Sequence, residues 1–306
     1  MTLFKFCNNS LLIPSYLING ILFGISWLLL VTYGAHEFIW ISLLIATSYF
    51  LSQIILFSKF DRNSFLICIP LSIYALLFGL IQEMVFIYSG ILSYPNESIF
   101  PPFWLLALYP LFALTLNSSL SFLNKNIVLT FILGGIGGTF SYILIEQLDG
   151  VLLLVPTGYP FLFTSSGLSL TLLILLNRKL ISLRKKYTDP KQIKKLLTVF
   201  FDKRCSFCSH EMQKLQNRNQ TGEVCYACPT ADEDLSKVTT AFTYKEAMET
   251  IHAIDEDNKV LTGTATISAL FARTDLPWIA LFLQAPGFFY LFEFGYLISA
   301  KCRRRT

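Results

Sequence analysis

Charged residues are distributed very unevenly along the chain, and this restricts the folds that it can adopt. Residues 1–177 contain four Lys or Arg and six Asp or Glu, whereas residues 178–306 contain twenty and fourteen. The first part includes apolar runs of about the 20 residues that a helix needs to cross a bilayer. Backbone groups in lipid must be paired within the segment, so these runs are expected to be helical. The sequence predicts a transmembrane domain at 1–177, a basic juxtamembrane linker at 178–196 and a second domain at 197–306.

Six apolar runs in the first part are long enough to form transmembrane helices. They cover residues 14–33, 38–58, 64–93, 101–123, 127–148 and 161–177. The third run is long for one span and can be accommodated by tilting. The first run lacks the small-residue cleavage site of a secretory signal, so we expect it to be retained.

Lysine and arginine in the short loops predict the orientation of these helices. They occur at the N-terminus, after the second and fourth runs and after the sixth, at Lys5, Lys59, Arg62, Lys125 and in the segment NRKLISLRKK. The three alternate loops contain no Lys or Arg. Since positive residues favour the cytoplasmic side, we expect both termini to be cytoplasmic. The basic linker then lies against anionic lipid headgroups or continues the last helix into solvent.

A few polar residues fall inside the apolar runs. Gln82 and Glu83 lie in the third run, Asn117 in the fourth and Tyr142 in the fifth. An ionisable residue at membrane depth is costly and by default indicates function, whereas amides and hydroxyls there often only bond one helix to another. The sequence therefore leaves open a transporter or membrane sensor in which Glu83 acts and the second domain regulates.

The segment LLTVFFDKRCSFCSHEM at the start of the second domain contains two cysteines three residues apart. Its apolar, strand-forming first half and its polar second half predict a strand, a turn and a helix. In this arrangement Cys205 lies at the exposed helix N-terminus and Cys208 on the inward face of the helix. A cytoplasmic location favours a catalytic or transient disulfide over a structural one.

The surroundings of the first cysteine favour nucleophilic chemistry. A helix N-terminus stabilises negative charge, and Lys203 and Arg204 add positive charge beside Cys205. Both favour the reactive thiolate. We therefore expect Cys205 to be the nucleophile and Cys208 the resolving thiol. Asp202 either accepts a proton from the inner cysteine or caps the turn.

A second pair, Cys225 and Cys228, follows the first at the spacing of a zinc ribbon. Zinc would require all four thiolates, those of Cys205, Cys208, Cys225 and Cys228, in a tetrahedral arrangement. The segment EVCYACP has the pattern of a strand, however, in which residues three apart point to opposite faces. Neither pair contains the glycine that a tight knuckle turn favours. A redox pair without cofactor is the favoured interpretation, with a zinc-stabilised interaction module and inert thiols as alternatives.

The pattern Asp202-x-x-Cys205-x-x-Cys208 after a hydrophobic strand resembles the DCC family of thiol-disulfide oxidoreductase-like proteins. The later segment AMETIHAIDEDNKVLTGTATISALF is similar to that family's helix, strand, turn and strand before a helix that begins G-x-A. Gly263 and Ala265 occupy the matching places. The resemblance implies a thioredoxin-like α/β fold with those three motif residues at its site.

The resemblance extends over about residues 197–305 and ends in APGFFYLFEFGYLISAKCRRR, which resembles the family's closing helix and includes Tyr296. This chain departs from the family pattern at Lys203 and Arg204, where a glycine is usual, and at Ser206, where proline is frequent. The departures bear on the rate of thiol exchange more than on the fold. We expect two helices here and no seventh span, because a span would place the terminal arginines outside.

The membrane part also resembles a known family. The stretches YSGILSYPN, FPPFWLLALYPLFALTLNSSLSFL and ILGGIGGTFSYILIEQLDG are similar to a bacterial multi-span membrane family of unknown function, over most of residues 10–177. The expected fold is an all-α membrane domain of about six transmembrane helices followed by a cytoplasmic α/β thioredoxin-like domain. The expected location is the inner (cytoplasmic) membrane.

These observations predict a membrane-anchored thiol-disulfide oxidoreductase that uses Cys205 and Cys208. Its expected partners are membrane lipid and a protein or small-molecule thiol or disulfide, with no nucleic acid. No pair of cysteines falls on the predicted outer side, so a complete thiol relay across the membrane is not expected within this chain.

Overall fold

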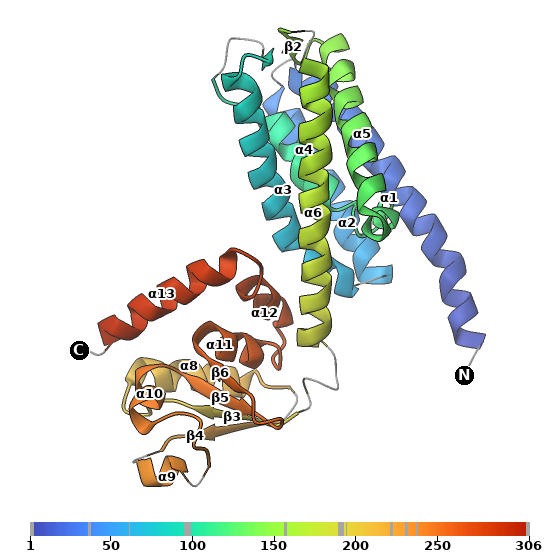
Figure 1. Ribbon diagram of the computed structural model, residues 1–306. Helices are drawn as coiled ribbons and strands as arrows, with labels where there is room; N and C mark the ends of the chain where they lie inside the picture. The colour runs from blue at the N-terminus through green and yellow to red at the C-terminus, as the bar shows by residue number, and fades with distance from the viewer. Residues whose placement is uncertain are drawn as a thin grey trace. The chain divides into compact units, whose positions relative to one another are not determined.

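The chain folds into two compact units, residues 1–179 and 180–306 (Figure 1). The computed structural model describes residues 3–35, 38–60, 62–94, 99–155, 158–188, 193, 195–220, 223–229, 232–236 and 238–303.

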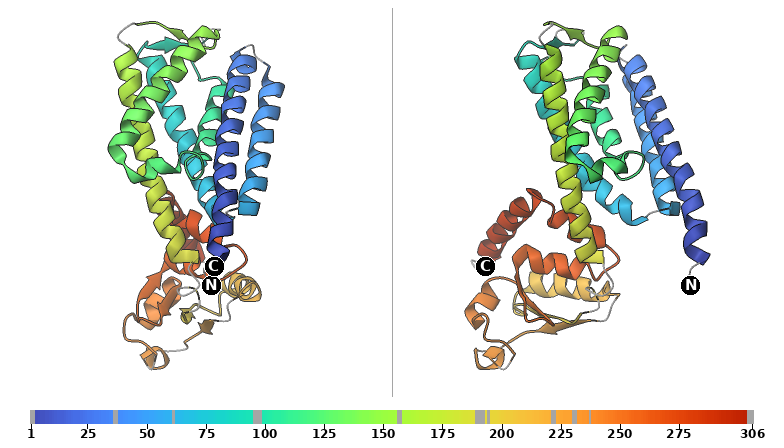
Figure 2. Two further views of the ribbon diagram at one scale, coloured as in Figure 1. Left: turned by 90° about the vertical axis from the view of Figure 1, so that its right-hand side faces the viewer. Right: turned by 45° about the vertical axis from the view of Figure 1, so that its right-hand side comes forward.

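The first unit is built from helices that run side by side (Figures 1 and 2). They are α1 (Leu3–Ala35), α2 (Ile39–Phe60), α3 (Arg62–Tyr88), α4 (Phe103–Ala113), α5 (Ile127–Gln147) and α6 (Gly158–Thr188), with a short 3-10 helix at Ser121–Lys125. A two-residue strand β1 (Leu92–Ser93) pairs antiparallel with β2 (Leu152–Leu153). This pairing joins the end of α3 to the segment between α5 and α6.

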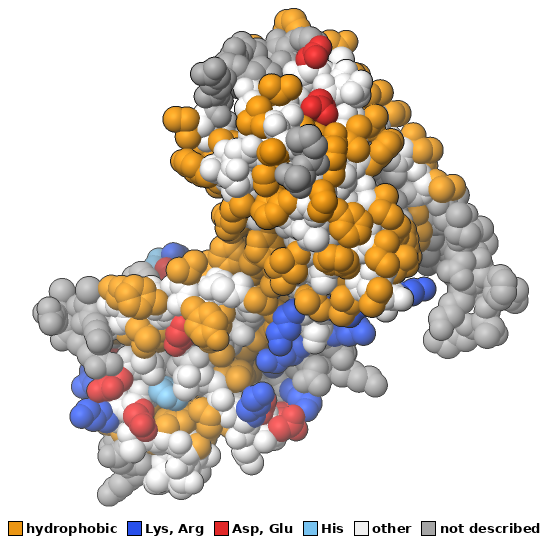
Figure 3. Space-filling view, turned by 45° about the horizontal axis from the view of Figure 1, so that its top comes forward, with side chains coloured by type: hydrophobic (Ala, Val, Ile, Leu, Met, Phe, Trp, Pro, Cys, Tyr) orange, Lys and Arg blue, Asp and Glu red, His pale blue; other side chains and the backbone are white. Residues whose placement is uncertain are grey.

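Several of these helices can cross a membrane. Within the described residues, four are long and apolar enough, in the segments Tyr16–Gly34, Ile67–Tyr88, Ile127–Gln147 and Gly158–Tyr187. Two shorter apolar helical segments are Trp40–Ile55 and Phe103–Ala113. Hydrophobic side chains cover much of the outer surface of this unit (Figure 3). Such a surface, together with several apolar helices of spanning length, indicates a multi-pass membrane protein.

The expectation of one continuous helix over residues 101–123 is wrong. α4 covers only the first half of this run, and the chain continues in turns to the 3-10 helix. The hydroxyl of Thr115 donates to the carbonyl of Phe112 (2.6 Å), and the amide of Asn124 donates to the carbonyl of Leu116 (3.1 Å). Hydrogen bonds from these polar side chains to backbone carbonyls compete with the hydrogen bonds of a continuous helix. Thr115 and Leu116 are almost fully buried, so the irregular backbone is protected from lipid.

Polar residues within this break bond the turn segment to neighbouring helices. The amide of Asn117 donates to the side-chain oxygen of Asn177 on α6 (3.0 Å). The hydroxyl of Ser119 donates to the side-chain oxygen of Asn19 on α1 (2.7 Å). The expected hydrogen bond of Asn117 to a neighbouring helix is present, but it starts from a turn and not from a helix.

The last helix of the first unit is longer than the sequence predicted. α6 continues to Thr188, so the first part of the basic linker is helical. The side chains of Lys5, Lys59 and Arg62, on which the orientation depends, lie outside the described residues, as do residues 189–192. The orientation stays a prediction.

The second unit contains a mixed four-stranded sheet with helices. Its strands are β3 (Leu197–Phe200), β4 (Val224–Ala227), β5 (His252–Asp255) and β6 (Val260–Thr262), in the order β4-β3-β5-β6. β3 pairs parallel with β4, and β5 is antiparallel to both β3 and β6. The helices are α8 (Ser206–Asn217), α9 (Asp232–Ser236), α10 (Tyr244–Glu249), α11 (Gly263–Phe271), α12 (Pro277–Leu283) and α13 (Phe288–Arg303).

Alternation along β3 places a hydrophobic core on each face of the sheet. Leu197 and Val199 point to one face and pack in a cluster with side chains of α8 and α11. Phe200 points to the other face and packs with Phe242 and with Ala247 of α10. Successive strand residues face opposite ways, so β3 is buried on both sides. The loop after β3 is therefore held at the end of the central strand.

The last apolar stretch forms two helices, as expected. α12 and α13 are bent by 94° at their junction, and a fifth span is reached only if this bent pair is counted as one. The Glu293 carboxylate of α13 accepts from the backbone N–H of Thr264 (3.0 Å). Gly263 has a φ of +52°, which glycine adopts far more readily than most residues, and a Cβ there would lie 2.6 Å from Glu293 Oε1. The absence of a side chain at Gly263 therefore allows Glu293 of α13 to reach the start of α11.

Candidate functional site

The turn after β3 is organised by Asp202. One carboxylate oxygen of Asp202 accepts from the backbone N–H of Arg204 (2.9 Å) and from its Nε (3.3 Å). The hydroxyl of Ser209 donates to the carbonyl of Lys203 (2.7 Å) and ties the turn to α8. The hydrogen bond to Asp202 raises the pKa of the Arg204 guanidinium, which stays charged. Asp202 therefore caps the turn, and its role as a proton acceptor stays a prediction.

Cys205 is the residue that caps α8. Its Sγ accepts from the backbone N–H of Cys208 (3.2 Å), and its carbonyl accepts from the N–H of Ser209 (3.0 Å). The first N–H groups of a helix have no partner within the helix and carry partial positive charge. Lys203 and Arg204 are exposed in the preceding turn. This surrounding favours negative charge on the sulfur.

The three residues predicted from the motif, Asp202, Cys205 and Cys208, line one cavity of about 400 Å³. Both thiols are half-buried. The other walls come from α8, from α10 and the segment after it, from α11 and from α13, whose Tyr296 also lines the cavity. The Tyr296 hydroxyl accepts from the backbone N–H of Ile251 (2.7 Å), so α13 is tied to another part of the cavity wall. A concave, partly apolar site with few polar groups is typical of ligand binding.

The second cysteine pair does not line this cavity. Cys225 is an exposed residue of β4, and Cys228 is exposed just after that strand. Throughout the part of the chain that the structure describes, no three His, Cys, Asp or Glu side chains are close enough to hold a metal ion. The structure does not bring Cys205, Cys208, Cys225 and Cys228 together as zinc ligands.

Sequence reasoning missed the connections between distant segments. Arg204 donates to the hydroxyl of Tyr244 on α10 (3.3 Å), and the cavity wall includes Met248 and Phe271. These residues lie some forty or more positions beyond the motif. Only the order of the strands brings them to the cysteines, and local spacing carries no signal for them.

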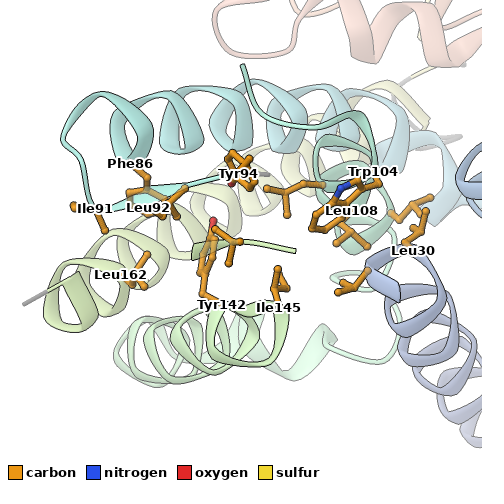
Figure 4. Packing of buried hydrophobic residues seen from close by; sticks show 14 of the residues in the cluster. Leu30, Phe86, Ile91, Leu92, Tyr94, Trp104, Leu108, Tyr142, Ile145 and Leu162 are labelled. Carbon is orange, nitrogen blue, oxygen red and sulfur yellow. The ribbon is translucent and has the colours of Figure 1, made fainter. Parts of the chain in front are cut away.

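A second polar site lies in the first unit, around Glu83. This carboxylate is fully buried, and it accepts hydrogen bonds from the hydroxyls of Tyr94, Tyr109 and Tyr142. Figure 4 shows Tyr94 and Tyr142 pointing toward one another within the buried cluster. The sequence indicated Glu83 and Tyr142 separately. It gave no reason to place them in contact or to add the other two tyrosines.

Comparisons with known proteins find two families in this chain. The family described as protein of unknown function (DUF2878) matches residues 16–171, and the DCC1-like thiol-disulfide oxidoreductase family matches residues 199–306. An uncharacterised chloroplastic protein of Arabidopsis thaliana is 24% identical over 120 residues, which are 39% of this chain and 56% of that protein. The chain therefore spans little more than half the length of this relative. No solved structure matches the chain.

Proposed function

The chain belongs to the DUF2878 family through residues 16–171 and carries a DCC1-like thiol-disulfide oxidoreductase domain at residues 199–306. From this premise, we propose that it exchanges dithiol and disulfide through Cys205 and Cys208 on the cytoplasmic side of the membrane. The observation that carries the proposal is the hydrogen bond from the Cys208 N–H to the Cys205 Sγ, at a helix N-terminus that opens on a cavity.

The arrangement of the second unit supports a thioredoxin-like domain. The strand order β4-β3-β5-β6, with β5 antiparallel to its neighbours, fits that fold. The cysteines follow the first strand of the sheet, where parallel β3 and β4 end together. In open sheets of this kind, ligands bind beyond the carboxyl ends of the parallel strands.

The proposed exchange has two steps. The Cys205 thiolate attacks one sulfur of a substrate disulfide, so that a mixed disulfide forms and the other substrate sulfur leaves as a thiolate. Cys208 then gives up its proton and attacks the Cys205 Sγ, which releases the second substrate thiolate. The substrate gains two electrons, and the chain holds a disulfide between Cys205 and Cys208. The same residues allow the reverse reaction.

The distribution of basic residues supports a cytoplasmic reaction. Lys125, at the end of the 3-10 helix, and the basic residues of α6 from Arg178 to Lys186 lie in segments expected on one side. Positive residues favour the cytoplasmic side, and each Lys or Arg near anionic lipid contributes about 1 kcal/mol to attachment. We propose that both termini and the second unit lie on that side of an inner membrane.

Alkylation of the full-length chain in detergent micelles tests the carrying observation. At neutral pH, we expect iodoacetamide to modify Cys205 about tenfold faster than Cys225, because a stabilised thiolate outweighs lower accessibility. Cys225 is exposed whereas Cys205 is half-buried, so accessibility alone predicts the reverse order. Site-resolved mass spectrometry measures both rates in one sample, and the denatured chain is the control, where the rates should become equal. Faster modification of Cys225 in the folded chain contradicts the proposal.

A further inference from the structure

The Glu83 carboxyl group lies inside the first unit and has no basic partner among the described residues. Oε1 accepts from the hydroxyls of Tyr109 and Tyr142, and Oε2 accepts from that of Tyr94. The Glu83 side chain is 0% exposed. Among the described residues, no Lys, Arg or His forms an ion pair with it. A buried carboxylate of this kind is stabilised by a proton or by another cation.

A cavity of about 470 Å³ lies beside this cluster. Tyr109 and Tyr142 form part of its wall, and Phe23, Trp27 and Phe78 add further aromatic rings. The volume is that of a site for a small organic molecule. Its lining is mainly apolar, so it offers too few oxygen ligands for a metal ion such as Mg²⁺ or Ca²⁺.

The polar groups of the cavity favour a ligand that is positive or donates hydrogen bonds. The phenol protons of Tyr109 and Tyr142 point to Glu83, so their oxygens present lone pairs elsewhere. The Ser166 hydroxyl also lines the cavity, is about nine-tenths buried and has no hydrogen-bond partner within the described part of the chain. An unsatisfied buried hydroxyl is costly, and a ligand with a polar group can satisfy it.

We propose that this cavity binds a lipophilic organic cation, and that the cation and a proton compete for the Glu83 cluster. Aromatic rings attract a cation through their negative faces, most strongly where water is excluded. The carboxylate adds a Coulomb attraction that is little screened in a low dielectric. A neutral ligand leaves the charge of Glu83 uncompensated, and an anion is repelled.

Competition with a proton gives the site a defined pH dependence. Glu83 accepts a hydrogen bond from one tyrosine on each of α4, α5 and the segment after β1. Among the described residues, no titratable side chain of α6 hydrogen-bonds to it. Glu83 is thus the acidic group of the cluster. Its protonation removes the charge that attracts the cation. Binding weakens as the pH falls through the titration of Glu83.

The test is equilibrium binding of radiolabelled tetraphenylphosphonium to the full-length chain in detergent micelles. The unchanged chain should bind about one cation, and binding should be weaker at about pH 5 than at about pH 8. Glu83→Gln should weaken binding by about tenfold or more and remove the pH dependence. Glu146→Gln is the matched control, since Glu146 does not line the cavity and instead accepts from the Leu153 N–H (3.1 Å). It should bind as the unchanged chain does.

A second pair of variants tests the proposal even if Glu83→Gln does not fold. Trp27→Leu keeps an apolar side chain in the cavity but removes the ring face, and it should weaken binding by about threefold to tenfold. Trp40→Leu is its control, because Trp40 is 80% exposed on α2 and does not line the cavity. Equal binding by Trp27→Leu and Trp40→Leu contradicts the proposal.

Tetraphenylborate separates charge from shape, because it has nearly the same size as tetraphenylphosphonium and the opposite charge. The proposal predicts much weaker binding of the borate. If the borate binds as tightly, or if the phosphonium does not bind, the cavity is not a cation site and the proposal is wrong. Loss of cation binding leaves thiol exchange in the second unit untouched, so the two functions fail separately.

Discussion

Replacing Cys208 with serine is expected to leave the chain joined to a disulfide substrate, whereas replacing Cys205 should abolish covalent capture. The Cys205 Sγ lies at the N-terminus of α8 and on the cavity, so it is the sulfur that a substrate reaches in reactive form. Without Cys208, nothing resolves the mixed disulfide. Oxidised glutathione is a suitable probe. Intact-mass measurement of the full-length chain should show a lasting glutathione adduct in Cys208→Ser and background exchange in Cys205→Ser.

The matched control for this result is Cys225→Ser. Cys225 is exposed on β4 and does not line the cavity, so its replacement should leave both capture and resolution unchanged. Peptide mapping should place the adduct of Cys208→Ser on Cys205. An adduct on Cys225, or exchange that survives in Cys205→Ser, contradicts the assignment of the nucleophile.

Phe200→Ala is expected to destabilise the second unit by about 3–5 kcal/mol. Phe200 is 1% exposed at the end of the central strand, and its ring lies 5.4 Å from that of Phe242 in an edge-to-face arrangement. Removing it leaves a cavity in the smaller of the two cores around the sheet. Since domains are stable by about 5–15 kcal/mol, this loss is a large share of the total.

Hydrogen exchange measures this loss within the full-length chain. Amides of β3 and β5 should exchange faster by the factor that corresponds to the lost free energy, because these central strands open only with the whole unit. Val238→Ala is the control, since Val238 is 59% exposed and its replacement should change stability by less than about 0.5 kcal/mol. Equal exchange in the two variants contradicts the packing of Phe200.

The membrane helices were predictable where the apolar pattern is uninterrupted. α5 and α6 begin within a few residues of the expected positions, because lipid allows no other paired backbone. The prediction of one helix over residues 101–123 was wrong, because hydropathy does not show whether the carbonyl groups of a turn have hydrogen-bond donors. Here the side-chain amide of Asn124 donates to the carbonyl of Leu116. The side-chain amide of Asn177 on α6 in turn donates to the side-chain oxygen of Asn124 (3.0 Å).

The candidate site was predictable in its local part alone. A strand, a turn and a helix are encoded by adjacent residues, so the place of Cys205 at the helix start followed from the sequence. The zinc spacing was present too, but β4 is an edge strand that leaves Cys225 exposed. The spacing of cysteines in the sequence does not determine the direction in which their side chains point. Contacts such as Tyr296 with Ile251 depend on how α13 docks, which no local pattern encodes.

The most direct measurement of the central claim is a thiol redox titration of the full-length chain. The chain is equilibrated across a glutathione redox series, with and without chelator, and its thiols are counted with a maleimide mass tag while zinc is measured on the same sample. The account predicts one reversible transition of two thiols, lost in both Cys205→Ser and Cys208→Ser, with and without chelator. Four protected thiols with about one zinc per chain, freed together by chelator, would make the domain a metal-stabilised module and contradict the account.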